Sequence, residues 1–128
     1  MRIDSLDHLV LTVADIDRTV RFYCDVLGME AIVFDGGRTG LKFGRSKINL
    51  HQVGHELQPN ALHPGAGSAD LCFITDDALD GVQAELEQNG IPIVEGPVLR
   101  TGALGTLRSV YVRDPDGNLV EISNQLSG

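Results

Sequence analysis

The sequence predicts a single α+β domain, residues 1–128, built from two tandem βαβββ modules. Three observations lead to this fold class. A strand–helix pattern near the N-terminus recurs 62 residues later, and three short strand patterns follow each helix. Each half, at about 55 residues, is too small to bury a sheet alone. We therefore expect modules at about 4–53 and 68–125, joined by a linker at 54–67, with helices outside a curved, mostly antiparallel cup.

The first strand and helix of each module carry the repeat. Residues 7–13 form a short apolar strand, and a helix is expected from the N-cap Asp15 to about Leu27. Residues 69–75 form the matching strand, with Asp77 as the matching N-cap. The pairs separated by 62 residues are His8/Asp70, Leu9/Leu71, Asp15/Asp77, Val20/Val82 and Gly28/Gly90.

The remaining strands are placed by apolar runs between turn residues. A Gly-rich segment, 99–107, is too long for a tight hairpin and is expected to be a mobile loop at the mouth of a site. The segment 114–118, Asp-Pro-Asp-Gly-Asn, has turn chemistry, so Asp114 and Asp116 are interpreted as turn formers. The expected strands are 31–34, 41–43 and 47–52 in the first module and 92–94, 109–113 and 119–123 in the second.

Composition narrows the functional classes. The net charge is −8 and no Lys/Arg cluster is present, which argues against nucleic acid and against anionic membrane surfaces as partners. No apolar run reaches membrane-spanning length and no signal peptide is evident, so a cytoplasmic protein is expected. Cys24 and Cys72 follow apolar patterns and are interpreted as reduced core thiols.

Strand parity separates an apolar, helix-facing side from a mixed side. The mixed side carries His8, Asn49, His51, Asp70, Tyr111 and Glu121, so most of its strands contribute a potential ligand. Such residues among small apolar neighbours indicate the floor of a cavity. Glu121 is costly to bury in an apolar strand unless it is paired.

The motifs Asp-His-Leu-Val-Leu-Thr-Val-Ala-Asp at 7–15 and Asp-Pro-Asp-Gly-Asn-Leu-Val-Glu at 114–121 carry a family resemblance. Together with the tandem modules, they resemble the vicinal oxygen chelate superfamily. That superfamily includes glyoxalase I, extradiol dioxygenases, fosfomycin resistance transferases and bleomycin-binding proteins. The chain looks closest to glyoxalase-domain-containing proteins, and these motifs specify the fold better than the reaction.

The resemblance implies a divalent metal site in the cup. His8 matches the ligand position on the first strand, and Glu121 matches the one on the last strand. Either His51 or Asn49 matches the last strand of the first module, and imidazole is the better ligand. Asp70 falls on the fourth position, where the family usually has His or Glu. The implied metal is Fe, Mn, Ni or Zn.

The resemblance implies an enzyme similar to glyoxalase I, a lyase or isomerase that acts on a small substrate chelated through neighbouring oxygens. The metal would act as a Lewis acid, and Glu121 would move a proton beside a carbonyl. One alternative is an extradiol-type Fe(II) dioxygenase. Another is a metal-free protein that binds small molecules, although the absence of Trp disfavours a stacking cleft.

Substrate contacts are expected from a few further side chains. Arg38, Arg45, Arg100 and Arg108 are the candidate contacts for an anionic substrate group. Arg100 and Arg108 are preferred because they flank the segment 99–107, and Tyr111 shares the sheet face of Glu121. No Lys/Arg-rich phosphonate pocket is evident, which disfavours fosfomycin-type thiol transfer. Family members commonly pair, so a homodimer is expected.

Overall fold

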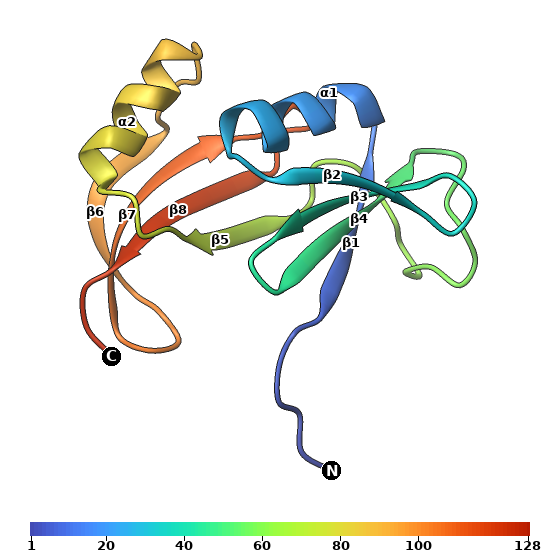
Figure 1. The fold of residues 1–128 in the computed structure, drawn as a ribbon, viewed down its shortest axis with the longest axis horizontal. Coiled ribbons are helices and arrows are strands. Elements are labelled where there is room, and N and C mark those ends of the chain that lie inside the picture. Colours follow the sequence, from blue (N-terminus) through green and yellow to red (C-terminus); the bar gives the residue numbers. More distant parts are fainter. The chain divides into compact units, whose positions relative to one another are not determined.

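The computed structural model describes residues 1–128 and divides them into two compact units, residues 1–67 and 68–128. Each unit is a four-stranded mixed sheet with a helical segment (Figure 1). The first unit contains β1 (His8–Val13), α1 (Ile16–Val20), the π-helix η1 (Arg21–Val26), β2 (Glu30–Phe34), β3 (Arg38–Phe43) and β4 (Ser46–Gln52). The second contains β5 (Asp70–Ile74), α2 (Leu79–Gln88), β6 (Glu95–Thr101), β7 (Thr106–Arg113) and β8 (Leu119–Gln125).

The two sheets have the same topology. The strand order is β1-β4-β3-β2 in the first unit and β5-β8-β7-β6 in the second. The pairs β1–β4 and β5–β8 are parallel, and the other two strand pairs in each sheet are antiparallel. The predicted α+β class, with mostly antiparallel strands in two repeated modules, is confirmed.

The first helix begins as the sequence predicts but contains an unexpected π-helical turn. The Asp15 carboxylate accepts a hydrogen bond from the Arg18 backbone N–H at 2.9 Å, as an N-cap does. After one α-helical turn the chain widens into η1, which buries the consecutive side chains Phe22 and Tyr23. Their rings meet edge to face, with centroids 5.0 Å apart.

The second helix is capped differently from the prediction. Asp77 was expected to cap it, but α2 begins at Leu79. Its N-cap residue, Ala78, has no side-chain atom that can accept a hydrogen bond. The Leu79 N–H donates instead to the Asn124 side-chain oxygen at 2.9 Å. The Asn124 amide also donates to the carbonyls of Thr75 and Asp77, at 2.9 and 2.8 Å. A side chain from β8 therefore replaces the local cap, which the repeat alone does not reveal.

The strand and loop predicted at 92–94 and 99–107 are wrong in position. Residues 92–94 precede the strand, and β6 and β7 form a hairpin that occupies most of the expected loop. Only residues 102–105 connect them, closed by the Gly102 N–H to the Gly105 carbonyl at 2.8 Å. A bulge between Glu95 and Val98 accommodates Gly96 and Pro97, which look like strand breakers in the sequence.

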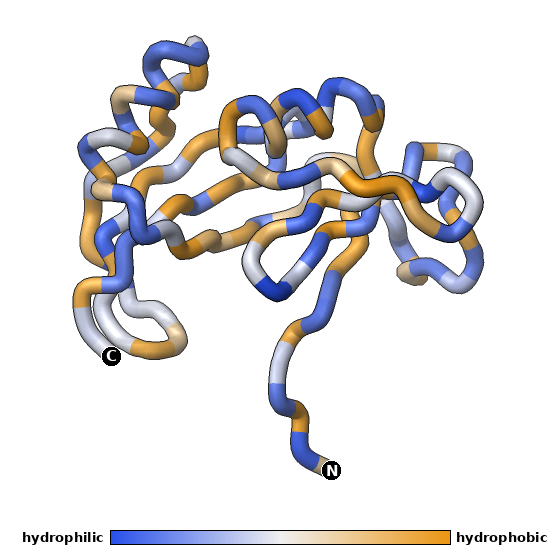
Figure 2. Tube along the Cα trace, in the orientation of Figure 1, coloured by the Kyte–Doolittle hydropathy of each residue, from blue (hydrophilic) through white to orange (hydrophobic).

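The core of each unit lies between its helix and its sheet. In the first unit α1 contacts β4, and in the second α2 contacts β7. Apolar and polar residues alternate along the strands (Figure 2), so one face of each sheet is buried. No helix of the chain has the length and apolarity needed to cross a membrane. The fully buried side chains include Val13, Tyr23, Leu41 and Ile48 in the first unit and Leu79, Val110, Val112 and Val120 in the second.

Candidate functional site

The second unit brings two predicted ligands, Asp70 and Glu121, to one pocket. In the parallel β5–β8 pair, Asp70 lies opposite Leu119 and Cys72 lies opposite Glu121. Asp70 is therefore one diagonal step from Glu121 on the same sheet face. Both carboxylates line a pocket of about 370 Å³ that also contains Arg100 and Tyr111. A pair of carboxylates at a half-open pocket can bind a divalent cation or move a proton.

The Glu121 carboxylate lies at the end of a buried hydroxyl pair. The Ser123 hydroxyl is 3.4 Å from Glu121 Oε2, a long and weak contact. The hydroxyls of Ser123 and Ser109 are 2.6 Å apart, and both residues are fully buried. No arginine or lysine forms an ion pair with Glu121. The Tyr111 hydroxyl and the Cys72 thiol also interact with this carboxylate, which raises the pKa of each. With no cation beside it, the carboxylate can accept a further bond from a ligand.

Arg100 and Tyr111 form the opposite wall of the pocket. Arg100 Nε donates to the Tyr111 hydroxyl oxygen at 3.0 Å, and the guanidinium also pairs with Glu95 at 3.3 Å. Because the Tyr111 oxygen accepts from Arg100, its own proton can be donated to the neighbouring Glu121 carboxylate or to a ligand. Burial raises the pKa of Tyr111, and the nearby Glu121 carboxylate raises it further, whereas the bond from Arg100 lowers it. Tyr111 is therefore a hydrogen-bond donor at neutral pH.

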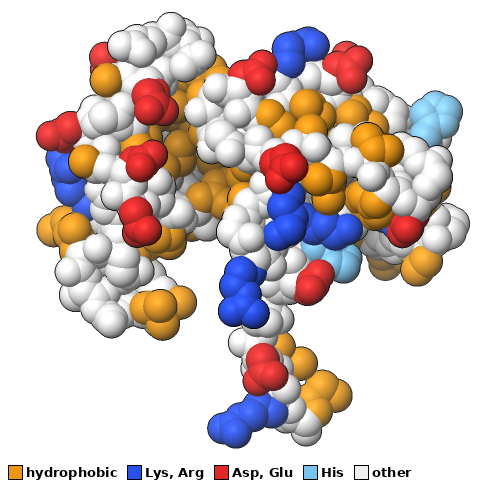
Figure 3. All heavy atoms as spheres, viewed as in Figure 1, with side chains coloured by type: hydrophobic (Ala, Val, Ile, Leu, Met, Phe, Trp, Pro, Cys, Tyr) orange, Lys and Arg blue, Asp and Glu red, His pale blue; other side chains and the backbone are white.

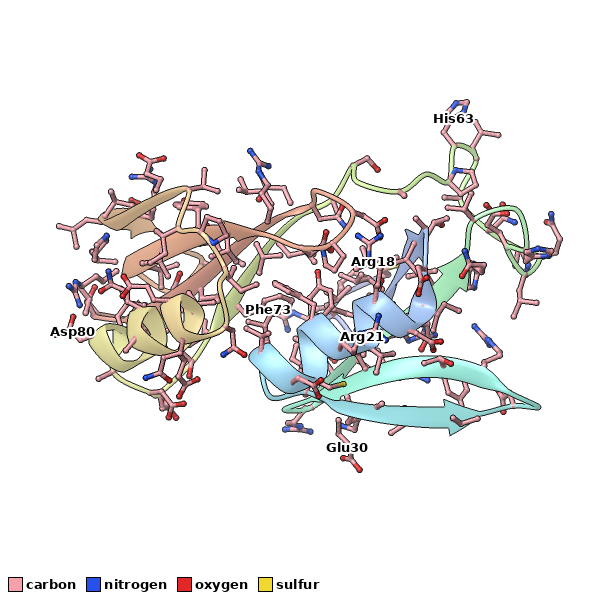
Figure 4. The ribbon with its side chains drawn as sticks, turned by 90° about the horizontal axis from the view of Figure 1, so that it is seen from above. Arg18, Arg21, Glu30, His63, Phe73 and Asp80 are labelled. Carbon is pink, nitrogen blue, oxygen red and sulfur yellow. The ribbon has the colours of Figure 1, made fainter.

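Arg108, the other arginine expected to contact substrate, lies on the helix side of the sheet. Its guanidinium is 3.5 Å from the carboxylate of Asp80, at the start of α2 (Figure 4). It shares strand parity with Val110 and Val112, which face the helix. The structure therefore brings Arg100 and Tyr111 to the face of Glu121, but not Arg108.

Cys72 is a pocket residue that the sequence reading placed in the core. Both cysteines are free, as expected, but Cys72 is exposed. With Glu121 it lines a second hollow of about 390 Å³, walled by Leu104 and Leu107. Burial raises the pKa of the Cys72 thiol, and the neighbouring carboxylates raise it further. The thiol is therefore protonated at neutral pH and is a poor nucleophile.

In the first unit, His8 is oriented like a metal-binding histidine. Its Nδ1 donates to the Asp7 carboxylate at 2.8 Å, a bond that lowers the pKa of Asp7. A donating Nδ1 leaves Nε2 as the free, ligating nitrogen. The side chain is 45% exposed, so a ligand can reach it.

His51 is placed far from His8. In the parallel β1–β4 pair, His8 lies opposite Lys47 and His51 lies opposite Thr12. Four residues along a strand correspond to about 13 Å, whereas ligands of one metal ion must converge within a few ångströms. Both residues line one groove of the first unit, but at this separation they do not converge on a single ion. His51 is only 5% exposed, and neither ring nitrogen has a hydrogen-bond partner.

The strand register also relates Asn49 and His51 to the second unit. Val10 lies opposite Asn49, and Cys72, which is 62 residues after Val10, lies opposite Glu121. Asn49 is therefore the repeat counterpart of Glu121, and His51 is the counterpart of Ser123. Within neither unit do three His, Cys, Asp or Glu side chains gather as a metal cluster.

Two further histidines lie in the segment between β4 and β5. His55 and His63 are exposed, and His63 points away from the sheet (Figure 4). They contribute nothing to either pocket-bearing face.

The fold and these sheet faces match one family of known proteins. The profile of the Glyoxalase/Bleomycin resistance protein/Dioxygenase superfamily matches residues 5–122. The chain belongs to this superfamily. The predicted vicinal oxygen chelate resemblance is thereby confirmed.

Two relatives share more than half of their aligned residues with this chain. It is 58% identical to the virulence protein STM3117 of Salmonella typhimurium, over 96% of this chain and 85% of that protein. It is 52% identical to the glyoxalase domain-containing protein RDO1 of Mycosarcoma maydis, over 97% of this chain and 70% of that protein. The crystal structure of STM3117 superposes with a TM-score of 0.97, covering 98% of this chain and all of that one.

A more distant relative of known structure is named as an enzyme. Lactoylglutathione lyase from Agrobacterium tumefaciens matches with a TM-score of 0.74 and 27% identity, over 97% of this chain and 96% of that one. The superfamily thus includes enzymes of the same size and fold.

Proposed function

We propose that this protein is a divalent-metal-dependent lyase or isomerase of the glyoxalase type, acting on a small, oxygen-rich substrate. The observation that carries the proposal is the pocket of the second unit, where Glu121 and Asp70 share one face with Tyr111 and Arg100. A carboxylate beside a carbonyl-bearing substrate is the standard base for moving a proton between neighbouring carbons.

Three side chains of the pocket have distinct proposed roles in the reaction. Glu121 is the proposed base, because it combines partial burial with the absence of any ion-pair partner. Tyr111 is the proposed donor to a substrate oxygen on which negative charge develops. Arg100 holds the Tyr111 hydroxyl in place through its 3.0 Å bond and supplies positive charge beside it.

The side chains present fit a divalent metal. In the second unit, Glu121 and Asp70 are candidate oxygen ligands. In the first unit, considered by itself, His8 is a candidate nitrogen ligand, because its bond to Asp7 leaves Nε2 free. Carboxylate and imidazole groups both bind Mn²⁺, Fe²⁺, Ni²⁺ and Zn²⁺. When bound, such an ion would polarise a substrate carbonyl as a Lewis acid.

The similarity to a lactoylglutathione lyase supports the reaction class. A probable lactoylglutathione lyase of Synechocystis is also 26% identical, over 90% of this chain and 91% of that protein. Sequence identities of 26% and 27% support a shared type of reaction more than a shared substrate.

The proposal is tested by metal content and proton exchange in the full chain. Protein purified without chelators is expected to carry about one Mn, Fe, Ni or Zn per chain and to exchange the carbon-bound proton of a hemithioacetal. The Glu121→Gln variant keeps the side-chain size, and it is expected to lose at least 100-fold in activity, within the range seen for removal of a general base.

Glu87→Gln is the matched control, because Glu87 is exposed on α2, away from the pocket. It should retain the metal and the activity. Wild-type protein that holds no metal after incubation with each ion, or that binds metal but exchanges no proton, would refute the proposal. The first result would favour a metal-free binding protein and the second a different reaction.

A further inference from the structure

The first unit contains a separate groove whose wall combines two cations with an aromatic ring. The groove has a volume of about 470 Å³ and is lined by strands β1 to β4 and by Leu57, Gln58 and Pro59. The Lys47 ammonium lies 3.7 Å from the centre of the Phe34 ring, and the Arg38 guanidinium lies 5.0 Å from it. Phe34 thus holds both cations at the same groove.

These cations have carboxylates nearby but no close ion pair, in a chain whose net charge is −8. Lys47 forms no ion pair, and Arg38 has only a long contact with Asp35, at 4.0 Å. Figure 3 shows Lys and Arg side chains beside a histidine on this unit, with acidic side chains next to them. Asp35 also lines the groove, and Lys47 interacts electrostatically with Asp7. Because neither carboxylate forms a close ion pair with Lys47, the ammonium is able to contact a bound anion.

The floor of the groove carries buried polar atoms that have no partner. His51 and Asn49 are 5% and 4% exposed, and both His51 ring nitrogens and Asn49 Oδ1 lack hydrogen bonds. Buried polar groups are nearly always satisfied, so orphaned ones at a groove floor indicate a missing ligand or ordered water. A small cavity of about 80 Å³ beside His51, under Pro59 and Pro64, has room for water.

Gly40 keeps this floor open. A Cβ at this position would lie 3.2 Å from a ring carbon of Phe34 and 3.4 Å from Asn49 Oδ1. It would also lie 3.2 Å from Ile32, so a larger residue would require the Phe34 or Ile32 side chain to move. The glycine therefore preserves space between the aromatic wall and the polar floor.

We propose that this groove binds the anionic end of a small molecule, a carboxylate or a phosphate. The anion would lie at Lys47 and Arg38, and a neighbouring polar group of the same molecule would bond to Asn49 and His51. The groove is formed within the first unit and does not include Glu121, but His8, a candidate metal ligand, also lines it. The inference therefore rests on the proposed function and adds to it the charge of the substrate. It gives His51 a role as a ligand-binding histidine at the groove floor.

The test is a titration of the full chain with inorganic phosphate and, separately, with acetate. Binding is monitored by NMR at low ionic strength. The two probes separate phosphate from carboxylate recognition. Saturable shifts of the His51 ring signals are expected with at least one probe. Lys47→Met keeps an apolar stem over Phe34 but removes the charge, and it should weaken binding roughly tenfold, the effect of one charge-assisted contact.

Lys42→Met is the matched control. Lys42 pairs with Lys47 in the β3–β4 register, but its ammonium donates to the Gly44 carbonyl at 3.0 Å and does not line the groove. It removes the same charge and should change affinity less than twofold. Equal effects of the two variants would show a general charge effect and overturn the proposal. The absence of saturable binding of both probes would also overturn it.

Two more variants separate this groove from the carboxylate pocket of the second unit. Gly40→Ala should weaken anion binding by narrowing the groove, with the fold checked by circular dichroism. Glu121→Gln should leave the anion titration unchanged. Loss of anion binding in Glu121→Gln would place the anion at the metal site and overturn the groove assignment, whereas an inactive enzyme that still binds anions would leave it intact.

Discussion

Asn118 is expected to be one of the most sensitive positions for stability, although it lies in a turn. The side chain is only 1% exposed and connects two segments. Its Nδ2 donates to the Asp114 carboxylate at 2.7 Å, and its Oδ1 accepts from the Ala69 N–H at 2.8 Å. Ala69 precedes Asp70, so this side chain fixes the start of β5 against the start of β8. That register brings Asp70 and Glu121 to one pocket.

The Asn118→Ala variant removes both bonds and leaves their partners unsatisfied. The bond to a carboxylate contributes about 1.5–3 kcal/mol and the bond to the backbone about 1 kcal/mol, so a loss of about 3 kcal/mol is expected. Urea unfolding followed by circular dichroism measures it. Asn89→Ala is the control, because Asn89 is exposed and bonds only to the Glu85 carbonyl within its helix end. A loss below about 1 kcal/mol, or equal to that of the control, would contradict this role.

Two further predictions use the electrostatics around Glu121. Ring NMR of Tyr111 should show a lower tyrosine pKa in Glu121→Gln, because the carboxylate raises it, and a higher one in Arg100→Gln, because the bond from Arg100 lowers it. Shifts of the same sign in both variants would contradict the described geometry. Cys72 should react with iodoacetamide at pH 8 more slowly than a free thiol, and faster in Glu121→Gln, because burial and the neighbouring carboxylates raise its pKa. Mass spectrometry of the modified peptide measures the rate, and an unchanged rate in the variant would argue against electrostatic coupling of Cys72 to Glu121.

The repeat made the fold predictable from the sequence, because the same local signals occur twice. The Asp15 cap is a local signal that involves neighbouring residues, and the structure has it as expected. The cap of α2 was missed because it comes from Asn124, 45 residues beyond the helix start. The β6–β7 hairpin was missed because Gly96 and Pro97 break the strand pattern in the sequence, whereas a bulge admits them in three dimensions.

The pocket of the second unit was predictable in part from strand parity. Alternation placed Glu121, Asp70 and Tyr111 on one face, and the structure has them there. The same parity applied to Arg108 points it at the helix, beside Val110 and Val112. The sequence therefore already indicated that Arg108 faces the helix. Arg108 was nevertheless expected to contact substrate because it flanks the segment 99–107. Lys47 and Phe34 carried no such signal, because their contact crosses from β4 to β2.

The strand register, which no single-sequence pattern encodes, also explains why the two halves of the repeat differ in chemistry. Parity admits both Asn49 and His51 on the inner face, and only the hydrogen-bonded pairing of β1 with β4 makes Asn49 the counterpart of Glu121. An amide therefore occupies in the first unit the position that a carboxylate occupies in the second. With Lys47 and Arg38 lining the same groove, that exchange supports the proposed anion site in the first unit, while the second unit has the two carboxylates that suit a cation.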